Sequence, residues 1–231
     1  MYQWTEERVL WYQRAVAYTG FDRKLLEWLT PYLPREESVC DLGCGTGYLA
    51  LELARQGYSV TAVDRSGVCM ERLRERRRLQ GLENLELWEA DWQNLMPGTQ
   101  WDNVLMVFAG RLDQEIEYYL SLSGKRLILV VKTSRQSHVQ AKGTLPLYRR
   151  DAGQLEEDIR SLKLKYTRLD GALEFGQPLC SREEARQYLA AFQVDADQPD
   201  GALERLVETG DPDYPLYLPG SKELAAFIIE K

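Results

Sequence analysis

One seven-residue segment, Asp41–Gly47 with the sequence DLGCGTG, constrains the fold of this chain more than any other. It follows the short apolar stretch Val39-Cys40 and leads into residues 48–54, whose apolar side chains recur with helical spacing. A strand, a glycine-rich turn and a helix N-terminus in this order form a nucleotide-type binding site. Glycine lets a ligand approach the backbone without meeting a Cβ, and the helix N-terminus offers unpaired N–H groups. We therefore expect a ligand carboxylate or phosphate at this turn.

The spacing of the glycines separates two kinds of cofactor. A dinucleotide fingerprint, G-x-G-x-x-G, that begins at Gly43 and Gly45 needs a third glycine where Tyr48 stands. The third glycine is Gly47 instead, and an acid, Asp41, precedes the first. This spacing argues against a nicotinamide dehydrogenase. The pattern D-x-G-x-G-x-G resembles the first motif of the class I S-adenosylmethionine-dependent methyltransferases.

Three later segments agree with this resemblance, which covers roughly residues 37–134. Residues 59–63 alternate and are mostly β-branched, so they predict a strand that ends at Asp64. Residues 85–90 are a third strand candidate and lead into Asp91. Residues 104–108 form the continuous apolar run that is typical of a buried central strand.

The resemblance implies a site for S-adenosylmethionine at the ends of these strands. Asp41 and the glycine loop would hold the methionine part, Asp64 the two ribose hydroxyls and Asp91 the adenine amino group. Taken singly, Asp64 or Asp91 could equally be a strand-end acid that faces solvent. The complete set of implied cofactor-binding residues is Asp41, Gly43, Cys44, Gly45, Gly47, Asp64, Arg65, Asp91 and Trp92.

The alternation of strand and helix patterns from Val39 onward predicts an α/β fold. We expect a doubly wound, mostly parallel seven-stranded sheet with helices on both faces, as in the Rossmann-like methyltransferase fold. One domain would comprise an N-terminal helical cap at 1–36 and a cofactor-binding α/β core at 37–180. An insertion with a helix and an acidic loop at 181–220 and a closing antiparallel strand at 221–231 would follow.

Local patterns predict three features of the second half, of which the first is left open. Asp170-Gly171 interrupts an apolar alternation at 167–175 and predicts either a two-residue hairpin turn or a kink within one strand. Ser181 with Glu184 predicts a capping box at the start of a helix. A short helical stretch is expected near 203–208 within an otherwise irregular excursion.

Composition excludes several classes of protein. A net charge of −7 argues against a general nucleic-acid binder, and the arginines of 72–78 alternate with glutamates that can pair with them on a helix. The 4 cysteines lack metal-ligand spacing, so we expect no metal and free thiols in a reducing cytoplasm. No apolar run has the length of a membrane span, and Met1–Arg8 lacks a signal-peptide pattern. We expect a cytoplasmic protein with no membrane partner, while the oligomeric state stays open.

The acceptor of the methyl group is defined mainly by elimination. The end of the fourth strand, Val107–Arg111, lacks the Asn/Asp-Pro-Pro-aromatic motif of many nucleobase and glutamine methyltransferases, and lacks a Pro-Cys pair. A small-molecule acceptor remains. Between Glu117 and Asp151 the chain has basic residues and no acid, which predicts that a loop containing Arg135 binds an anionic acceptor. The alternative is a solvated basic loop that offsets the acidic C-terminal region.

His138 in the same loop is the candidate catalytic base, because its reference pKa of about 6.5 suits proton transfer near neutrality. The aromatic N-terminus supplies further candidates for substrate contact, which are Trp4, Trp11, Tyr12 and Tyr18. Of these we select Trp11 and Tyr18. The alternative is that these rings pack into the core, which is the default for an amphipathic helix.

Two other functions stay open beside methyl transfer. One is a catalytically silent S-adenosylmethionine-binding module or partner subunit, because a binding loop does not by itself establish turnover. The other is an aminopropyl transferase on the same fold, although the basic loop is opposite in charge to a polyamine pocket.

Overall fold

The computed structural model describes residues 5–96, 98–109, 115–133, 151–192 and 199–231. Seven strands form the main sheet: β1 (Val39–Leu42), β2 (Val60–Asp64), β3 (Leu85–Glu89), β4 (Trp101–Val107), β5 (Ser123–Lys132), β6 (Tyr166–Glu174) and β10 (Ser221–Glu230). A second sheet has three strands: β7 (Gln177–Leu179), β8 (Val207–Glu208) and β9 (Leu216–Leu218).

The described helices alternate with these strands along the chain. They are α1 (Glu6–Thr19), α2 (Phe21–Leu29), α3 (Tyr48–Arg55), α4 (Gly67–Gln80), α5 (Ile116–Leu122), α6 (Ala152–Ser161), α7 (Arg182–Phe192) and α8 (Pro199–Glu204). Two short 3-10 turns, Thr30–Tyr32 and Trp92–Asn94, follow α2 and β3.

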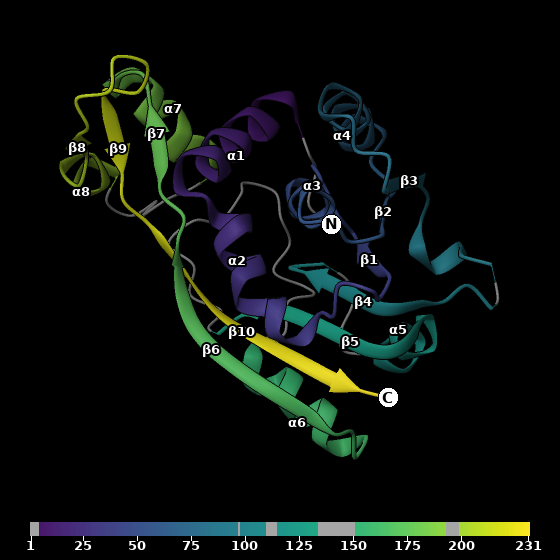
Figure 1. Ribbon diagram of the computed structural model, residues 1–231. Coiled ribbons are helices and arrows are strands. Elements are labelled where there is room, and N and C mark those ends of the chain that lie inside the picture. The colour runs from purple at the N-terminus through teal and green to yellow at the C-terminus, as the bar shows by residue number, and fades with distance from the viewer. Residues whose placement is uncertain (1–4, 97, 110–114, 134–150, 193–198) are drawn as a thin grey trace.

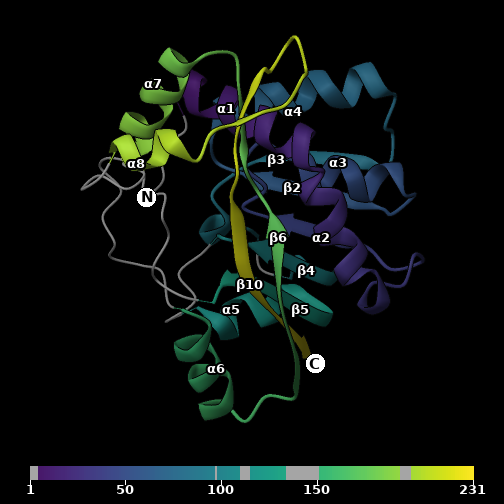
Figure 2. The ribbon, with the colours of Figure 1, turned by 90° about the vertical axis from the view of Figure 1, so that its left-hand side faces the viewer.

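The main sheet has the order β3-β2-β1-β4-β5-β10-β6. Strands β1 to β5 pair in parallel, and β10 pairs antiparallel with both β5 and β6. Helices α2, α3 and α4 bury their apolar side chains against one face, and α5 and α6 against the other (Figures 1 and 2). The predicted doubly wound, mostly parallel seven-stranded fold is confirmed, as is the antiparallel closing strand.

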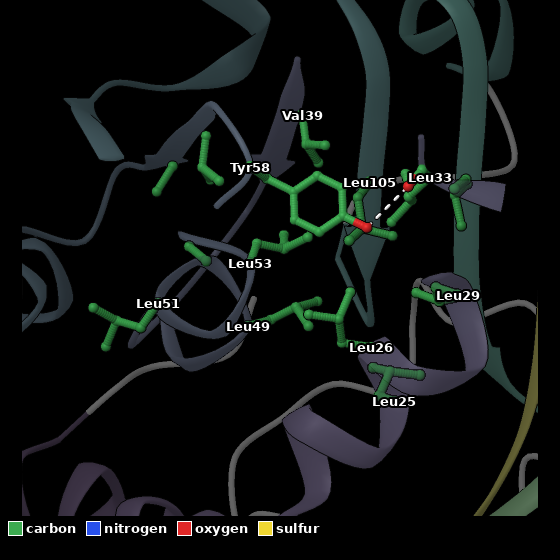
Figure 3. Close-up of a cluster of buried hydrophobic side chains, with 14 of the residues drawn as sticks. Leu25, Leu26, Leu29, Leu33, Val39, Leu49, Leu51, Leu53, Tyr58 and Leu105 are labelled. Carbon is green, nitrogen blue, oxygen red and sulfur yellow. Dashed lines mark hydrogen bonds between the residues drawn. The ribbon is translucent and has the colours of Figure 1, made fainter. Parts of the chain in front are cut away.

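Tyr58, between α3 and β2, belongs to the buried core cluster on the α2–α3 face (Figure 3). Its ring is fully buried, and its hydroxyl donates a hydrogen bond of 2.9 Å to the carbonyl oxygen of Leu33. A buried tyrosine hydroxyl without a partner would cost stability, so this bond fixes the path of the segment between α2 and β1. The segment in turn places α2 beside the ends of the central strands.

Asp170 and Gly171 lie inside a single strand and not in a hairpin turn. Strand β6 pairs with β10 without interruption, with Asp170 opposite Ala225 and Gly171 opposite Leu224. A Cβ on Gly171 would lie 2.2 Å from Cζ2 of Trp28 on α2. The glycine therefore permits close packing of α2 on the strand, and local turn propensity is overridden by this contact.

The excursion after β6 forms a small unit beside α1. Strands β7, β9 and β8 pair antiparallel, and α7, α8 and α1 bury a cluster around Trp11 against them. The helix predicted near 203–208 is wrong in position, because α8 ends at Glu204 and Val207–Glu208 is a strand. The predicted cap of α7 is confirmed: Ser181 Oγ accepts a hydrogen bond of 3.1 Å from the backbone N–H of Glu184.

We predict that Gly171→Ala lowers the free energy of unfolding by about 1–3 kcal/mol, because the added methyl group overpacks the contact with Trp28. Urea unfolding followed by tryptophan fluorescence measures the change. Gly153→Ala in helix α6 is the matched control, because its Cβ would meet only Asp151 Oδ1 at 3.4 Å. A Gly171→Ala protein as stable as the control would contradict the packing role.

Candidate cofactor and acceptor site

The loop between β1 and α3 has the backbone conformation that its glycines predict. Gly43, Gly45 and Gly47 have φ angles of 79°, 55° and 70°, all in the left-handed region that favours glycine. A Cβ on Gly43 would lie 2.7 Å from Cβ of Ala109, and one on Gly47 would lie 2.4 Å from Leu73 Cδ2. The loop therefore lies against its neighbours with no room for side chains at these two positions.

Strand β2 holds this loop in place. The backbone N–H groups of Gly43 and Cys44 donate hydrogen bonds of 2.8 and 3.1 Å to the carbonyl oxygen of Val63. Asp64, at the end of β2, accepts a bond of 2.8 Å from the Gly45 N–H on Oδ2 and one of 2.8 Å from the Ser66 N–H on Oδ1. Asp64 is buried, so its carboxylate organises the backbone of the loop as well as lying where the ribose is expected.

The residues that are predicted to bind the adenine lie close together after the neighbouring strand, β3. Asp91 follows β3 and accepts a hydrogen bond of 3.1 Å from the Gln93 N–H on Oδ1. Its Oδ2 lies 3.3 Å from Nη1 of Arg65, so two predicted residues form an ion pair with each other. The ring of Trp92 approaches the glycine loop, because a Cβ on Gly43 would lie 3.2 Å from its Cζ3.

A small cavity of about 40 Å³ lies beside the loop, where the methionine part of the cofactor is expected. Its walls come from α1, α2, the loop, the start of α3 and the end of β4: Tyr12, Asp22, Asp41, Gly43, Cys44, Thr46, Tyr48, Leu49, Val107 and Phe108. Two of these residues are acids with almost no exposure, Asp41 at 3% and Asp22 at 5%. In both, Oδ2 has no hydrogen-bond partner among the residues that the structure describes.

Burial changes the titration of both acids. Desolvation, the neighbouring Asp22 and then Asp64 raise the pKa of Asp41 to about 8, against a hydrogen bond from the Ala50 N–H that lowers it. Desolvation raises the pKa of Asp22 to about 7, Lys222 lowers it and Glu52 raises it. Both carboxyl groups therefore hold protons at a pH where an exposed aspartate is ionised.

The ring of Phe108, directly after β4, lies beside the ammonium of Lys222 from β10. Phe108 has a φ of 55°, an uncommon backbone conformation for a bulky residue that is found most often at functional sites. The ammonium of Lys222, the second residue of β10, lies 5.0 Å from the ring centroid of Phe108 and 3.1 Å from that of Phe175. Lys222 also lies 4.5 Å from the ring centroid of Phe21 on α2.

The aromatic residues of the N-terminal cap lie in different environments. Tyr12 lines the cavity. Trp11 is 4% exposed and packs on Tyr188 and Phe192 of α7, so core packing accounts for its ring. Tyr18 is 41% exposed, stacks on Tyr217 and is not one of the residues that line the cavity. Ligand contact by Trp11 and Tyr18 stays a prediction, and Tyr12 is added to them as a residue that lines the cavity.

Cys44 lies in the loop as a half-buried thiol whose pKa is raised well above its ordinary value, first by burial and then by Asp41. Such a thiol is a poor nucleophile. Two further predicted residues, Arg135 and His138, lie outside the described residues. Within the described part of the chain no group of three or more His, Cys, Asp or Glu residues could hold a metal ion.

Asp22 is the residue of this site that the sequence-based prediction missed. It lies on the same helical stripe as Leu25, Leu26 and Leu29, which are fully buried. A carboxylate on the apolar face of an amphipathic helix is the pattern that would have indicated it.

The helices described here include none that is long and apolar enough to cross a membrane.

Comparison with known proteins agrees with this arrangement. Residues 39–122 match the family model described as a methyltransferase domain. An uncharacterized protein of Haemophilus influenzae is 30% identical over 126 residues, which are 51% of this chain and 44% of that protein. The 23S rRNA (uracil(1939)-C(5))-methyltransferase RlmD of Aeromonas salmonicida is 33% identical over 135 residues, 54% of this chain and 30% of that protein. The chain thus spans less than half the length of these curated relatives.

Solved structures extend the likeness to almost the whole chain. The structure of coclaurine N-methyltransferase bound to N-methylheliamine and SAH superposes with a TM-score of 0.55 at 18% identity, covering 90% of this chain and 71% of that one. At such identity the likeness shows the fold. The family model adds that residues 39–122, about a third of the chain, are similar to a methyltransferase domain, and the glycine motif lies within that range.

We predict that the stability of the protein falls as the pH rises from about 5 to about 8. Because the pKa values of Asp22 and Asp41 are raised to about 7 and about 8, the folded state binds more protons than the unfolded state over this window. Asp22→Asn removes one of these groups, so this variant should lose less stability and be the more stable protein at pH 8.

Thermal unfolding of both proteins at several pH values measures this difference, with about 2–4 °C expected for each kcal/mol. The exposed Glu27→Gln on the same helix is the control and should follow the wild type. Parallel pH profiles for the wild type and Asp22→Asn would contradict the assignment of raised pKa values to this cavity.

Proposed function

We propose that this chain binds S-adenosylmethionine and transfers its methyl group to a small, anionic acceptor. The observation that carries the proposal is the conformation of the glycine loop. Gly43, Gly45 and Gly47 all have left-handed φ angles, and two of these positions have no room for a Cβ. Buried polar atoms that lack partners, Oδ2 of Asp41 among them, lie beside that loop. The residues present therefore fit a ligand with a cationic group at this end.

Each part of the cofactor would have a matching group on the protein. Asp41 and the loop backbone would hold the methionine part, and Asp64 the ribose. The two backbone bonds that Asp64 accepts use only part of its capacity, because a carboxylate has about four acceptor positions. Asp91 would exchange or share its bond with Arg65 when the adenine amino group binds.

S-adenosylmethionine carries an activated methyl group, so the protein has to supply little covalent chemistry of its own. Its task is to hold an acceptor in line with the methyl–sulfur bond and to exclude water, which contributes at most about 7–11 kcal/mol. Phe108 and Tyr12, which line the cavity beside the loop, are placed to form walls toward the acceptor.

The charge of the proposed acceptor rests on two features. The sequence from 118 to 150 contains basic residues, with Arg135 and His138 among them, and no acid. The described part of the site adds the ammonium of Lys222 beside Phe108. An acceptor carboxylate or phosphate would meet positive charge from both, and His138 would remove a proton where the acceptor atom carries one.

A uracil carbon is a poorer candidate for the acceptor, although RlmD is a partial relative. Methylation at that carbon needs a nucleophile that first adds to the ring. The thiols near the cavity in the described structure, Cys40 and Cys44, both have pKa values raised well above the ordinary range by burial. The net charge of −7 also opposes binding to RNA.

We expect S-adenosylhomocysteine to bind the purified protein with micromolar affinity in calorimetric titration, and NADH not to bind. Asp64→Ala should abolish binding, because it removes the ribose acceptor and the bonds that order Gly45 and Ser66. The exposed Glu83→Gln is the control and should bind as the wild type does. Lack of S-adenosylhomocysteine binding to the wild type would refute the cofactor assignment.

For the acceptor, methyl transfer from labelled S-adenosylmethionine would be screened over small carboxylates and phosphates. With the acceptor found, His138→Ala should lower kcat at least about 100-fold if the histidine removes a proton. S-adenosylhomocysteine binding should stay unchanged. Turnover equal to the wild type would exclude His138 as the base and leave the methyltransferase assignment intact.

A further inference from the structure

Two carboxylates from different elements share the cavity beneath the glycine loop. Asp22 comes from the first turn of α2 and Asp41 from β1, and both are more than nine-tenths buried. Oδ2 of each lacks a hydrogen-bond partner among the described residues, and both residues line the same 40 Å³ space. Burying polar atoms without partners costs stability, so a ligand that supplies donors there would recover it.

Helix stability does not explain why Asp22 is buried. An acid in the first turn interacts favourably with the helix dipole, and an exposed acid there would gain the same benefit. Burial adds only a desolvation cost to that benefit. The other acid of this helix, Glu27, is exposed to solvent, which is the usual environment of an acid that binds no ligand.

The charged groups around Asp22 do not neutralise the pair. Lys222 faces it from β10, Glu52 from α3 and Asp41 from β1, and Asp64 of β2 acts on Asp41. Tyr48, at the start of α3, is a further titratable group that Asp22 influences. Only Lys222 opposes protonation of Asp22, and its ammonium lies over the rings of Phe21, Phe108 and Phe175.

We propose that Asp22 and Asp41 together bind the α-ammonium group of the cofactor's methionine part, and that this group takes the place of a proton held by the pair. Asp22 is then a cofactor-binding residue supplied by the N-terminal cap. This inference rests on the proposed function, because it assumes that S-adenosylmethionine occupies the loop. The displaced proton passes to solvent, so cofactor binding releases protons near neutral pH.

The size and the chemistry of the cavity favour an ammonium over a metal ion. A space of about 40 Å³ admits a group of roughly the size of a water molecule. An ammonium carries three donors and a full charge, which suits two acceptor oxygens in a site of low polarity. A divalent metal would need more oxygen ligands than this pair offers, and the described residues contain no group of three or more His, Cys, Asp or Glu that could hold a metal ion.

The test compares two probes that differ only at the amino-acid end. S-adenosylhomocysteine carries the ammonium, whereas 5′-methylthioadenosine keeps the adenosine and the sulfur and lacks both the amino and the carboxyl group. Each is titrated calorimetrically into wild type, Asp22→Asn, Asp22→Ala and the control Glu27→Gln at pH 7. Two buffers of different ionisation enthalpy give the number of protons released.

Wild type should release protons with S-adenosylhomocysteine and none with 5′-methylthioadenosine. Both Asp22 variants should bind S-adenosylhomocysteine at least about tenfold more weakly, as expected for loss of a buried charge pair. They should release fewer protons and bind 5′-methylthioadenosine as the wild type does. Glu27→Gln should match the wild type throughout, and thermal unfolding confirms that all variants fold.

Two results would overturn the inference and leave the proposed function standing. One is equal weakening of both probes by the Asp22 variants, which would indicate a general effect on the site. The other is unchanged S-adenosylhomocysteine binding in these variants, or wild-type binding without proton release. If neither probe binds the wild type, the proposed function fails first and the inference fails with it.

Discussion

The attachment of the glycine loop to strand β2 is the interaction on which the site depends. Val63 and Asp64 together accept hydrogen bonds from three successive N–H groups of the loop, those of Gly43, Cys44 and Gly45. These bonds fix the loop in its left-handed conformation, and the loop then starts α3 at Tyr48. Because β1 and β2 are parallel neighbours, the sheet topology alone brings these groups to one edge.

Sequence patterns predicted those parts of the fold that depend on local information. The parallel strands were found from their apolar runs, and the loop from its glycine spacing, because both requirements act within a few residues. Asp170-Gly171 could not be resolved in the same way, since a remote ring, Trp28, decides its conformation. Val207–Glu208 was missed as a strand because it has only two residues and is defined by its pairing with β9, not by a pattern of its own.

The candidate site shows the same division. Asp41 was predicted because it precedes the glycines of the motif, and Asp64 and Asp91 because each ends or follows a strand and parallel strands end at one edge of a sheet. Asp22 and Lys222 lie far from this motif in sequence, at positions 22 and 222, and only the packing of α2 and β10 brings them to it. Whether Trp11 or Tyr12 lines the cavity likewise depends on which way α1 faces. That orientation is set by the unit of α7, β7 and β9 on which Trp11 packs.

Lys222 already places one positive charge close to Asp22, and the proposed α-ammonium group of the cofactor would add a second. The first charge alone does not balance the buried acid. Burial outweighs its effect, since the pKa of Asp22 is still raised. The aromatic rings of Phe21, Phe108 and Phe175 also attract the ammonium of Lys222 and help to hold it beside them. In the proposed complex the α-ammonium group would pair with Asp22 and Asp41. The ammonium of Lys222 would then be available to an acceptor at the end of β4. The same lysine would thereby couple cofactor binding to recognition of an anion.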